Sequence, residues 1–305
     1  MNYNIFTTLI LLCLVTACDF RQDHPISIAT TVAGDDVESR NEFKDYWYAG
    51  KAEVNSYQLR QARYGEIHNG DAVLVFVTEP FSESRQVKLD YPEESGKDKV
   101  DVLKLNAIRK FNTGIYDYSM MTSVFTPVDH NTYPYSLKST TSSQEWCGHT
   151  FTQFNLDRNK YRMKQFSYFE QEGDEDKNVD AAILEDALFS HLRLNGGELP
   201  LGEVDLIPST TYTRLKHEPI RPTAASITRT QSERKSTYVI EYQHYDRTLT
   251  IDVEQVFPHK ILAWSESNGD GLTTTARLKE TLNTDYWSKH NNQHEPMRDE
   301  LGLTK

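Results

Sequence analysis

The sequence predicts a mainly β protein, built as a curved antiparallel sheet or half-barrel with one packed helix. Stretches rich in β-branched and aromatic residues, separated by turn signals, recur along most of the chain. Convincing helical periodicity appears once, and the alternation of strands and helices that builds parallel sheets is not seen. These observations favour one antiparallel β domain.

The first element is the apolar run Ile5–Val15, which ends in Leu14-Val15-Thr16-Ala17-Cys18. A membrane-spanning helix needs roughly 20 apolar residues, so this run indicates a secretory signal. The small residues before Cys18 resemble the lipobox of bacterial lipoproteins. We therefore predict a signal peptide over residues 1–17 and lipidation of Cys18, which would hold the protein at a membrane. An ordinary cleaved signal or a buried strand is the alternative, because no Lys or Arg precedes Cys18.

The rest of the chain divides into three parts. Residues 18–41 are polar and lack sustained apolar periodicity, which predicts a flexible tether. Residues 42–288 carry the strand signals and are predicted to form a single β-rich domain. Residues 289–305 form a polar C-terminal tail, in which Met297–Leu303 could form at most a short docking segment.

Strand signals dominate the domain. Asn69-Gly70 lies between Glu66–His68 and Asp71–Val77 and predicts a type I′ hairpin, because both turn residues need φ > 0. Alternation by two is clearest in three sets, which predict an antiparallel meander with one buried face: Tyr238, Ile240, Tyr242; Leu249, Ile251, Val253; and Ile261, Ala263. Further predicted strands lie in Ala52–Tyr64, Val100–Leu105, Tyr116–Phe125, Trp146–Phe154 and Tyr161–Phe169.

The single predicted helix rests on one apolar stripe. Leu184, Leu188 and Leu192 recur at i+4, between a start near Asn178 and an end at Asn195-Gly196-Gly197. A helix packed on a curved sheet is similar in shape to lipoprotein carriers of the LolA and LolB type, by analogy of architecture only.

The charge of the chain argues against a nucleic-acid-binding protein, and its cysteine content argues against a fold held by disulfides. A net charge of −12 disfavours nucleic-acid binding. With Cys13 removed with the signal and Cys18 lipidated, Cys147 stands alone, so no intramolecular disulfide is expected and the core must hold the fold.

Cys147 and His149 are the first candidates for chemistry. A cysteine nucleophile needs a base within hydrogen-bond reach, and residues two apart on a strand share a face without reliably touching. The interpretation that we favour is a buried Cys packed as a small hydrophobe beside Trp146. We assign no catalytic residue.

Asp174, Asp176, Asn178 and Glu185 are the second candidate, at positions one, three, five and twelve of an EF-hand-like calcium loop. Val179 stands where that loop requires Gly. A solvated acidic loop that favours the following helix through its dipole explains the same residues, with Glu185 on the polar side. We therefore predict no metal and no cofactor. The Tyr-rich strands could present a carbohydrate-binding surface, but core packing is the more common role.

Four segments resemble a known family: Phe43–Glu53, Gln61–Glu66, Thr113–Met121 and Gln144–Phe151. They resemble an uncharacterised family of Gram-negative lipoproteins whose members often carry the label "septum formation inhibitor Maf". That label implies a nucleotide pyrophosphatase with a Ser- and Arg-rich phosphate loop. The chain after Cys18 has no such loop, so we interpret the label as an error and transfer no catalytic residues from it.

Together these features predict a membrane-anchored envelope lipoprotein, at the outer rather than the inner membrane. Its expected role is a non-enzymatic binding or assembly module for a partner protein or an apolar ligand. The rival hypothesis is an envelope hydrolase with an unidentified active site. An enzyme needs converging titratable groups in a cleft, a carrier needs an apolar cavity, and a partner-binding module needs an exposed apolar patch.

Overall fold

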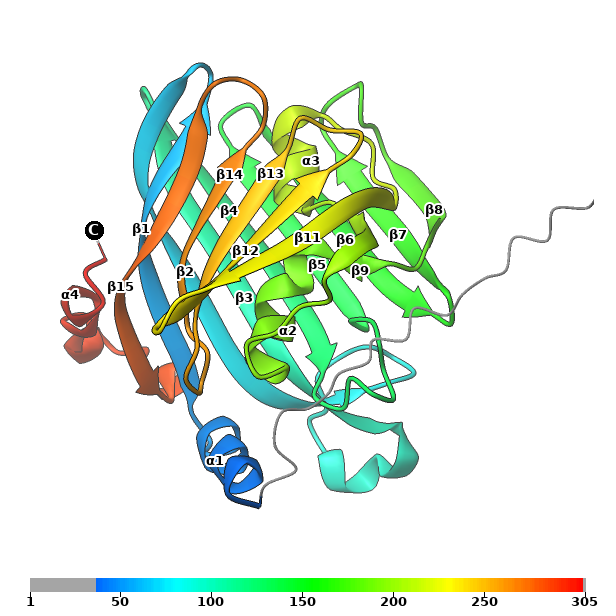
Figure 1. The fold of residues 1–305 in the computed structure, drawn as a ribbon, viewed down its shortest axis with the longest axis vertical. Helices are drawn as coiled ribbons and strands as arrows, with labels where there is room; N and C mark the ends of the chain where they lie inside the picture. Colours follow the sequence, from blue (N-terminus) through cyan, green and yellow to red (C-terminus); the bar gives the residue numbers. More distant parts are fainter. Residues whose placement is uncertain (1–36, 304–305) are drawn as a thin grey trace, which may run out of the picture.

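The computed structural model describes residues 37–303 and contains one 15-stranded sheet that curls around two short helices (Figure 1). Every neighbouring pair of strands is antiparallel except β9 and β10. The strands are β1 (Ala52–Arg63), β2 (Glu66–Ser82), β3 (Lys99–Thr113), β4 (Tyr116–Pro127), β5 (Lys138–Glu145), β6 (Gly148–Asp157), β7 (Lys160–Ser167), β8 (Glu175–Asp180), β9 (Ile183–Leu184), β10 (Gly202–Ile207), β11 (Thr223–Gln231), β12 (Lys235–Tyr242), β13 (Thr248–Glu254), β14 (Ile261–Ser267) and β15 (Thr273–Thr284). The mainly β, curved antiparallel sheet is confirmed.

The strand order explains the curl. It runs from β8 back to β1, continues with β15 and ends at β9, so the chain starts in the middle of the sheet. The two edge strands, β8 and β9, are joined by only Ala181 and Ala182. This short connection requires the two edges to lie close together, and the sheet therefore wraps most of the way round (Figure 1).

Two helices, α2 (Leu188–Leu194) and α3 (Thr210–Lys216), lie inside the curl, between β11–β13 and the strands behind them (Figure 1). The main core joins the inward faces of both halves of the sheet to α2. Its fully buried members include Tyr57, Phe76, Leu105, Leu188, Leu192, Tyr238 and Ile251. The interior of the curl is thus occupied by side chains from α2 and the strands around it.

The predicted meander is present as β12, β13 and β14, and its alternating side chains are buried up to Ile261. Ala263 is the exception, because Trp264 takes the inward position instead. The pairing register shifts between Asp252 and Val253, and this bulge moves the alternation of β14 by one residue.

The predicted turn at Asn69-Gly70 is wrong. Both residues lie within β2, and the hairpin turns at Tyr64-Gly65, where φ is 54° and 78°. Gly70 has a different role, because a Cβ there would lie 2.1 Å from the Lys110 carbonyl oxygen of β3. The glycine allows two strands to approach closely, which the Asn-Gly turn signal does not reveal.

The predicted helix is shorter than its leucine stripe. Leu184, Leu188 and Leu192 are all buried, but α2 begins only at Leu188. Leu184 belongs to β9, where it pairs with Ile207 of β10, and a 3-10 turn over Glu185–Ala187 joins the two elements. The stripe marks a buried face that a strand end, a turn and a helix share.

The structure contains more helices than the single one predicted. α3 is rich in threonine, a weak helix former, and is stabilised by burial and by Ser209, whose hydroxyl accepts a hydrogen bond from the Thr211 amide (3.2 Å). α1 (Val37–Trp47) begins inside the predicted tether and places the start of the fold before Glu42. The predicted signal peptide, Cys18 and most of the tether lie outside the described residues.

The C-terminal segment docks on the outer face of the sheet. α4 (Met297–Glu300) is followed by Leu301, which packs against a small outer cluster of Ala52, Val54, Val75 and Val77. The Ser56 hydroxyl donates a hydrogen bond to the Leu301 carbonyl (2.5 Å). Among residues 37–303, no helix has the length and apolar character to cross a bilayer.

Candidate functional site

The β1–β2, β3–β4, β5–β6 and β7–β8 connections lie at one end of the molecule, and each carries an exposed apolar side chain. Tyr64 lies at the β1–β2 turn, Ile115 at the β3–β4 turn, Trp146 at the β5–β6 turn and Tyr168 directly after β7. Their exposed fractions are 61%, 86%, 67% and 71%. The strands β1 to β8 are consecutive neighbours in the sheet. The four tips therefore follow one another in a row at one end of these strands. We call these four residues the aromatic rim.

Direct contacts connect the hairpins of the aromatic rim. The hydroxyls of Tyr64 and Tyr118 are 2.9 Å apart, and the rings of Tyr116 and Trp146 are 6.3 Å apart. The Trp146 indole N–H donates to Asp117 (2.9 Å). The Tyr168 ring covers Gly148, where a Cβ would lie 2.8 Å from it. The rim is therefore a continuous surface.

α3 supports the aromatic rim from inside the curl. The buried Arg214 side chain lies over the Phe169 ring, 4.0 Å from its centre, and its guanidinium approaches Glu172 (3.4 Å) and Glu145 (3.8 Å). Glu172 also contacts His217 Nδ1 (2.7 Å) at the end of α3. These contacts fix the β5–β6 and β7–β8 connections, so the rim side chains are presented on a preorganised frame.

Cys147 and His149 lie at this end of the molecule, and the expectation of a buried cysteine is wrong. Cys147 occupies the exposed β5–β6 turn and His149 is exposed on β6. The pKa of the Cys147 thiol is raised by hydrogen bonding and charge from Glu145. A raised pKa disfavours the thiolate that a nucleophile requires. Cys147 is exposed because Glu145 pairs with Gly148, which leaves Trp146 and Cys147 as the two residues of the β5–β6 turn.

The acidic residues of the calcium hypothesis do not converge. Asp176 pairs with Arg162 on the neighbouring strand (2.8 Å), and Asp174 accepts a hydrogen bond from the Ser167 amide (3.1 Å). Asn178 is exposed on β8, and Glu185 is buried in the interior. Among residues 37–303, no group of three or more His, Cys, Asp or Glu side chains could hold a metal ion.

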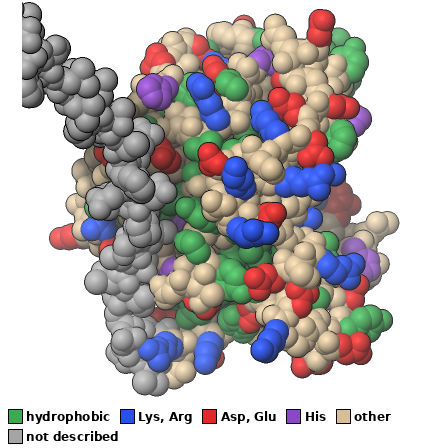
Figure 2. All heavy atoms as spheres, turned by 90° about the vertical axis from the view of Figure 1, so that its right-hand side faces the viewer, with side chains coloured by type: hydrophobic (Ala, Val, Ile, Leu, Met, Phe, Trp, Pro, Cys, Tyr) green, Lys and Arg blue, Asp and Glu red, His purple; other side chains and the backbone are tan. Residues whose placement is uncertain are grey.

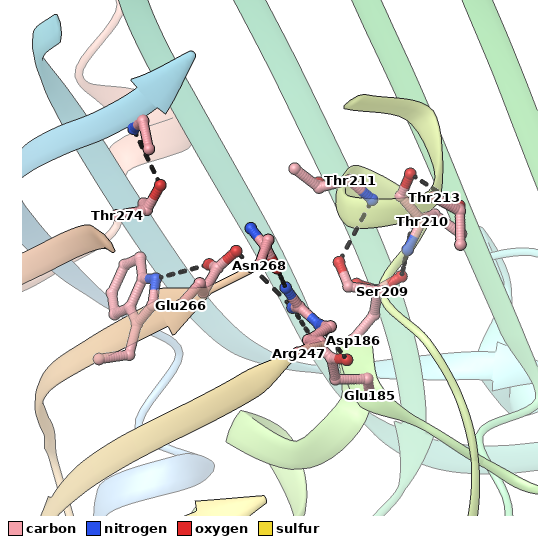
Figure 3. Close-up of polar contacts among 12 residues, drawn as sticks. Glu185, Asp186, Ser209, Thr210, Thr211, Thr213, Arg247, Glu266, Asn268 and Thr274 are labelled. Atoms are coloured by element: carbon pink, nitrogen blue, oxygen red, sulfur yellow. Dashed lines mark hydrogen bonds and ion pairs between the residues drawn. The ribbon is translucent and has the colours of Figure 1, made fainter. Parts of the chain in front are cut away.

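Glu185 belongs instead to a buried polar network inside the curl (Figure 3). Arg247 of the β12–β13 connection, whose side chain is fully buried, donates to both Glu185 oxygens (2.5 and 3.2 Å) and to Asn268 (2.6 Å). Its guanidinium also lies 3.6 Å from Glu266. The prediction that Glu185 lies on a polar, solvated side is therefore wrong, because its partner comes from a strand connection 62 residues away.

The same network continues through Glu266 and Asp186. Arg109 donates to Glu266 (2.6 Å). Burial would raise the pKa of Glu266, but the Arg109 and Arg247 charges lower it. Asp186 accepts hydrogen bonds from the Thr210 amide (3.1 Å) and hydroxyl (2.6 Å), and burial raises its pKa. These carboxyl groups line a cavity of about 40 Å³, which has room for only one or two waters.

The geometry of this network fits a structural role. Its carboxylates are engaged by arginines or by backbone and hydroxyl donors, and the cavity beside them is too small for a substrate. The network connects β13 and β14 to the segment that leads into α2 and α3. It therefore holds the interior helices against the sheet.

The aromatic rim was not predicted from the sequence. Most of the tyrosines on the strands are core residues, such as Tyr57, Tyr118 and Tyr238, as expected. The available signal was the presence of large apolar residues at turn positions, because hairpin turns are usually polar. Ile115 and Trp146 carry that signal, but in the sequence they adjoin or begin the predicted strands Tyr116–Phe125 and Trp146–Phe154, which hides the turns.

No family model matches this chain, and no curated protein matches it. Among solved structures, it is similar to a protein from Brucella abortus described as a beta-barrel-like protein of domain of unknown function DUF1849. The two are 9% identical, the match covers 77% of this chain and 98% of that one, and the TM-score is 0.46. At this level the likeness carries no information on function.

Proposed function

We propose that this chain is a lipid-anchored envelope protein that acts as a non-enzymatic binding module, and that a partner protein docks on the aromatic rim. The observation that carries the proposal is the exposure of Tyr64, Ile115, Trp146 and Tyr168 on one continuous surface. Large exposed aromatic side chains beside an arginine are typical of interaction hot spots, and Arg63 lies 4.3 Å from the centre of the Tyr64 ring.

The geometry supports a partner protein better than an apolar ligand. A carrier of apolar ligands needs an apolar cavity, but α2 and the surrounding core side chains occupy the interior of the curl.

The docking proposal is tested with a photo-reactive amino acid at Ile115, which should crosslink one partner protein in intact cells. Trp146→Ala and Tyr168→Ala should each reduce that crosslink by at least tenfold, because hot-spot truncations cost about 2 kcal/mol or more. Tyr91→Ala is the matched control, since Tyr91 is 72% exposed on a loop outside the aromatic rim. Equal losses for Tyr91 and Tyr168 would contradict the proposal, provided that all variants keep the wild-type melting temperature.

The anchoring proposal is tested at the N-terminus. Cys18→Ser should release the chain from the membrane fraction or leave its signal uncleaved, because lipidation requires that thiol. Cys13→Ser is the control and should leave the chain at the membrane, which we propose to be the outer one. Mass spectrometry of the wild type should find acyl groups on an N-terminal Cys18. An unmodified N-terminus at another residue would exclude the lipoprotein assignment.

A further inference from the structure

A large cleft opens at the end of the molecule opposite the aromatic rim. The β2–β3 connection (residues 83–98), the β4–β5 connection (residues 128–137) and the β6–β7 turn border it, and the outer face of β5–β7 forms its floor. Its volume is about 1130 Å³, which is large enough for an extended ligand of several rings. We call this feature the basic cleft.

The charge of the basic cleft contrasts with that of the whole protein. The chain has a net charge of −12, yet the cleft is lined by six cations and three carboxylates: Arg85, Lys97, Lys138, Arg158, Arg162 and Lys164 against Glu83, Asp98 and Asp157. Figure 2 shows Lys and Arg side chains on the face that carries β7 and β8, with Asp and Glu side chains among them. A local excess of cations on an acidic protein attracts anionic ligands.

The cations and carboxylates of the cleft do not neutralise one another fully. Among residues 37–303, Arg85, Lys97 and Lys138 have no carboxylate oxygen within 4.0 Å. The nearby carboxylates accept hydrogen bonds from neutral donors: Glu83 from the Tyr133 hydroxyl (2.9 Å) and Asp98 from the Ser84 amide (2.8 Å). Hydrogen bonds from Ser82 and Ser84 are the main reason that the pKa of Asp98 is lowered, and the Arg85 charge adds a smaller contribution without a direct ion pair. The three cations are therefore available to an anionic ligand.

The floor of the cleft is fixed by hydrogen bonds between amide side chains. The buried Gln86 side chain donates to the Leu156 carbonyl (2.7 Å) and accepts from Asn155 (2.7 Å), which accepts from Gln153 (2.6 Å). The half-buried Lys138 ammonium donates to the Gln86 carbonyl (3.1 Å), and burial lowers its pKa. A partly desolvated ammonium on a rigid polar floor gains more from an anion than an exposed lysine does.

The walls add flat apolar surfaces. Tyr133 and Tyr135, with Pro134 between them, line one side of the cleft. Aromatic rings bind the apolar faces of sugars, amide side chains bind their hydroxyls, and free cations bind acidic substituents. From this combination we propose that the basic cleft binds an anionic saccharide, with carboxylate or phosphate groups on its sugar rings.

Isothermal titration calorimetry on the full chain in detergent tests the proposal with three probes. Trigalacturonate, which carries a carboxylate on each ring, should bind at low salt and weaken as salt increases. Neutral maltotriose should bind at least tenfold more weakly, and tripolyphosphate, an anion without rings, should also bind at least tenfold more weakly. Equal binding of trigalacturonate and either of the other probes would overturn the assignment.

Variants connect the binding to the cleft. The double variant Arg85→Gln/Lys138→Met should weaken trigalacturonate binding by at least tenfold, because it removes two cations that have no carboxylate partner. Lys110→Met, on β3 outside the cleft, is the control for charge and should change the affinity by less than twofold. If Lys110→Met weakens binding as much as the double variant, the site lies elsewhere and the proposal fails. Crosslinking at the aromatic rim is a separate readout, so failure here leaves the proposed docking function intact.

Vesicle flotation distinguishes a free saccharide from a lipid headgroup. Phosphatidylcholine vesicles that contain phosphatidylinositol carry an anionic headgroup with a ring, whereas those with phosphatidylglycerol carry an anionic headgroup without one. Binding to the first alone, lost in Arg85→Gln/Lys138→Met, would support the proposal with a membrane lipid as the source. Trigalacturonate binding without vesicle binding would support it with a free saccharide. The proposal would be contradicted if the protein bound both kinds of vesicle equally, kept that binding in the double variant and did not bind trigalacturonate.

Discussion

Arg193→Met is expected to lower the free energy of unfolding by about 3–5 kcal/mol, as when one partner of a buried ion pair is removed. Arg193 of α2 donates to both carboxylate oxygens of Glu53 in β1 (2.6 and 2.5 Å), and both side chains are fully buried. The same guanidinium donates to the Pro258 carbonyl (2.7 Å) and lies 4.7 Å from the centre of the Phe76 ring. Methionine retains most of the volume but leaves the Glu53 charge without its cation.

The pH dependence of stability shows whether the unpaired Glu53 carboxylate causes the loss of stability in Arg193→Met. Burial would raise the pKa of Glu53, but the Arg193 charge and its hydrogen bonds lower it. In the wild type this contribution is therefore fully present above the pKa of an unfolded glutamate, roughly 4.3, and is lost as the pH falls through the lower folded value. In Arg193→Met, burial raises the folded pKa, so the variant loses stability as the pH rises. The difference between the two proteins should thus be larger at neutral than at acidic pH.

Urea unfolding measures both effects, and a double variant is the control. Glu53→Gln/Arg193→Met removes both charges, so at neutral pH it should recover part of the stability that Arg193→Met loses. It should also lack the loss of stability that Arg193→Met shows as the pH rises, because residue 53 no longer titrates. A double variant as unstable as Arg193→Met at every pH would show that the loss comes from packing around α2 and not from the unpaired carboxylate.

Much of the sheet could be predicted from the sequence because its signal is local. Tyr238, Ile240 and Tyr242 alternate with polar neighbours, and this period of two requires no knowledge of the partner strands. The closure of the curl could not be predicted in this way. It depends on Ala181 and Ala182, which look like ordinary helix residues until β8 and β9 are known to be the two edges of the sheet.

The interior polar groups escaped prediction for a related reason. Glu53 and Arg193 are 140 residues apart in sequence, and each resembles a surface charge when considered alone. α3 escaped because its threonines favour strands, and only burial inside the curl makes a helix of them. The basic cleft likewise combines two connections and a turn that are far apart along the chain, so no single segment shows its excess of cations.

Glu185→Ala is expected to lower the free energy of unfolding by about 3–5 kcal/mol, in contrast to the small effect expected for a solvated acidic loop. The substitution leaves the fully buried Arg247 guanidinium without its closest carboxylate, and it leaves the buried Tyr242 hydroxyl without the oxygen that it contacts at 2.6 Å. Asp176→Ala is the matched control, because Asp176 belongs to the same predicted loop but forms an exposed pair with Arg162. Its loss should leave stability nearly unchanged, because an exposed ion pair is screened by solvent and contributes little.

Thermal and urea unfolding of the two variants, with and without calcium, separate the two explanations of this segment. A buried network predicts a large loss for Glu185→Ala, a negligible loss for Asp176→Ala, and the same melting temperatures at millimolar calcium. A calcium loop predicts that calcium raises the melting temperature of the wild type and that either substitution abolishes the increase, because a ligand that binds only the folded state stabilises it by mass action. Glu185 faces Arg247 across the interior, so we expect the first pattern, and a calcium-dependent increase that both variants lose would refute the network assignment.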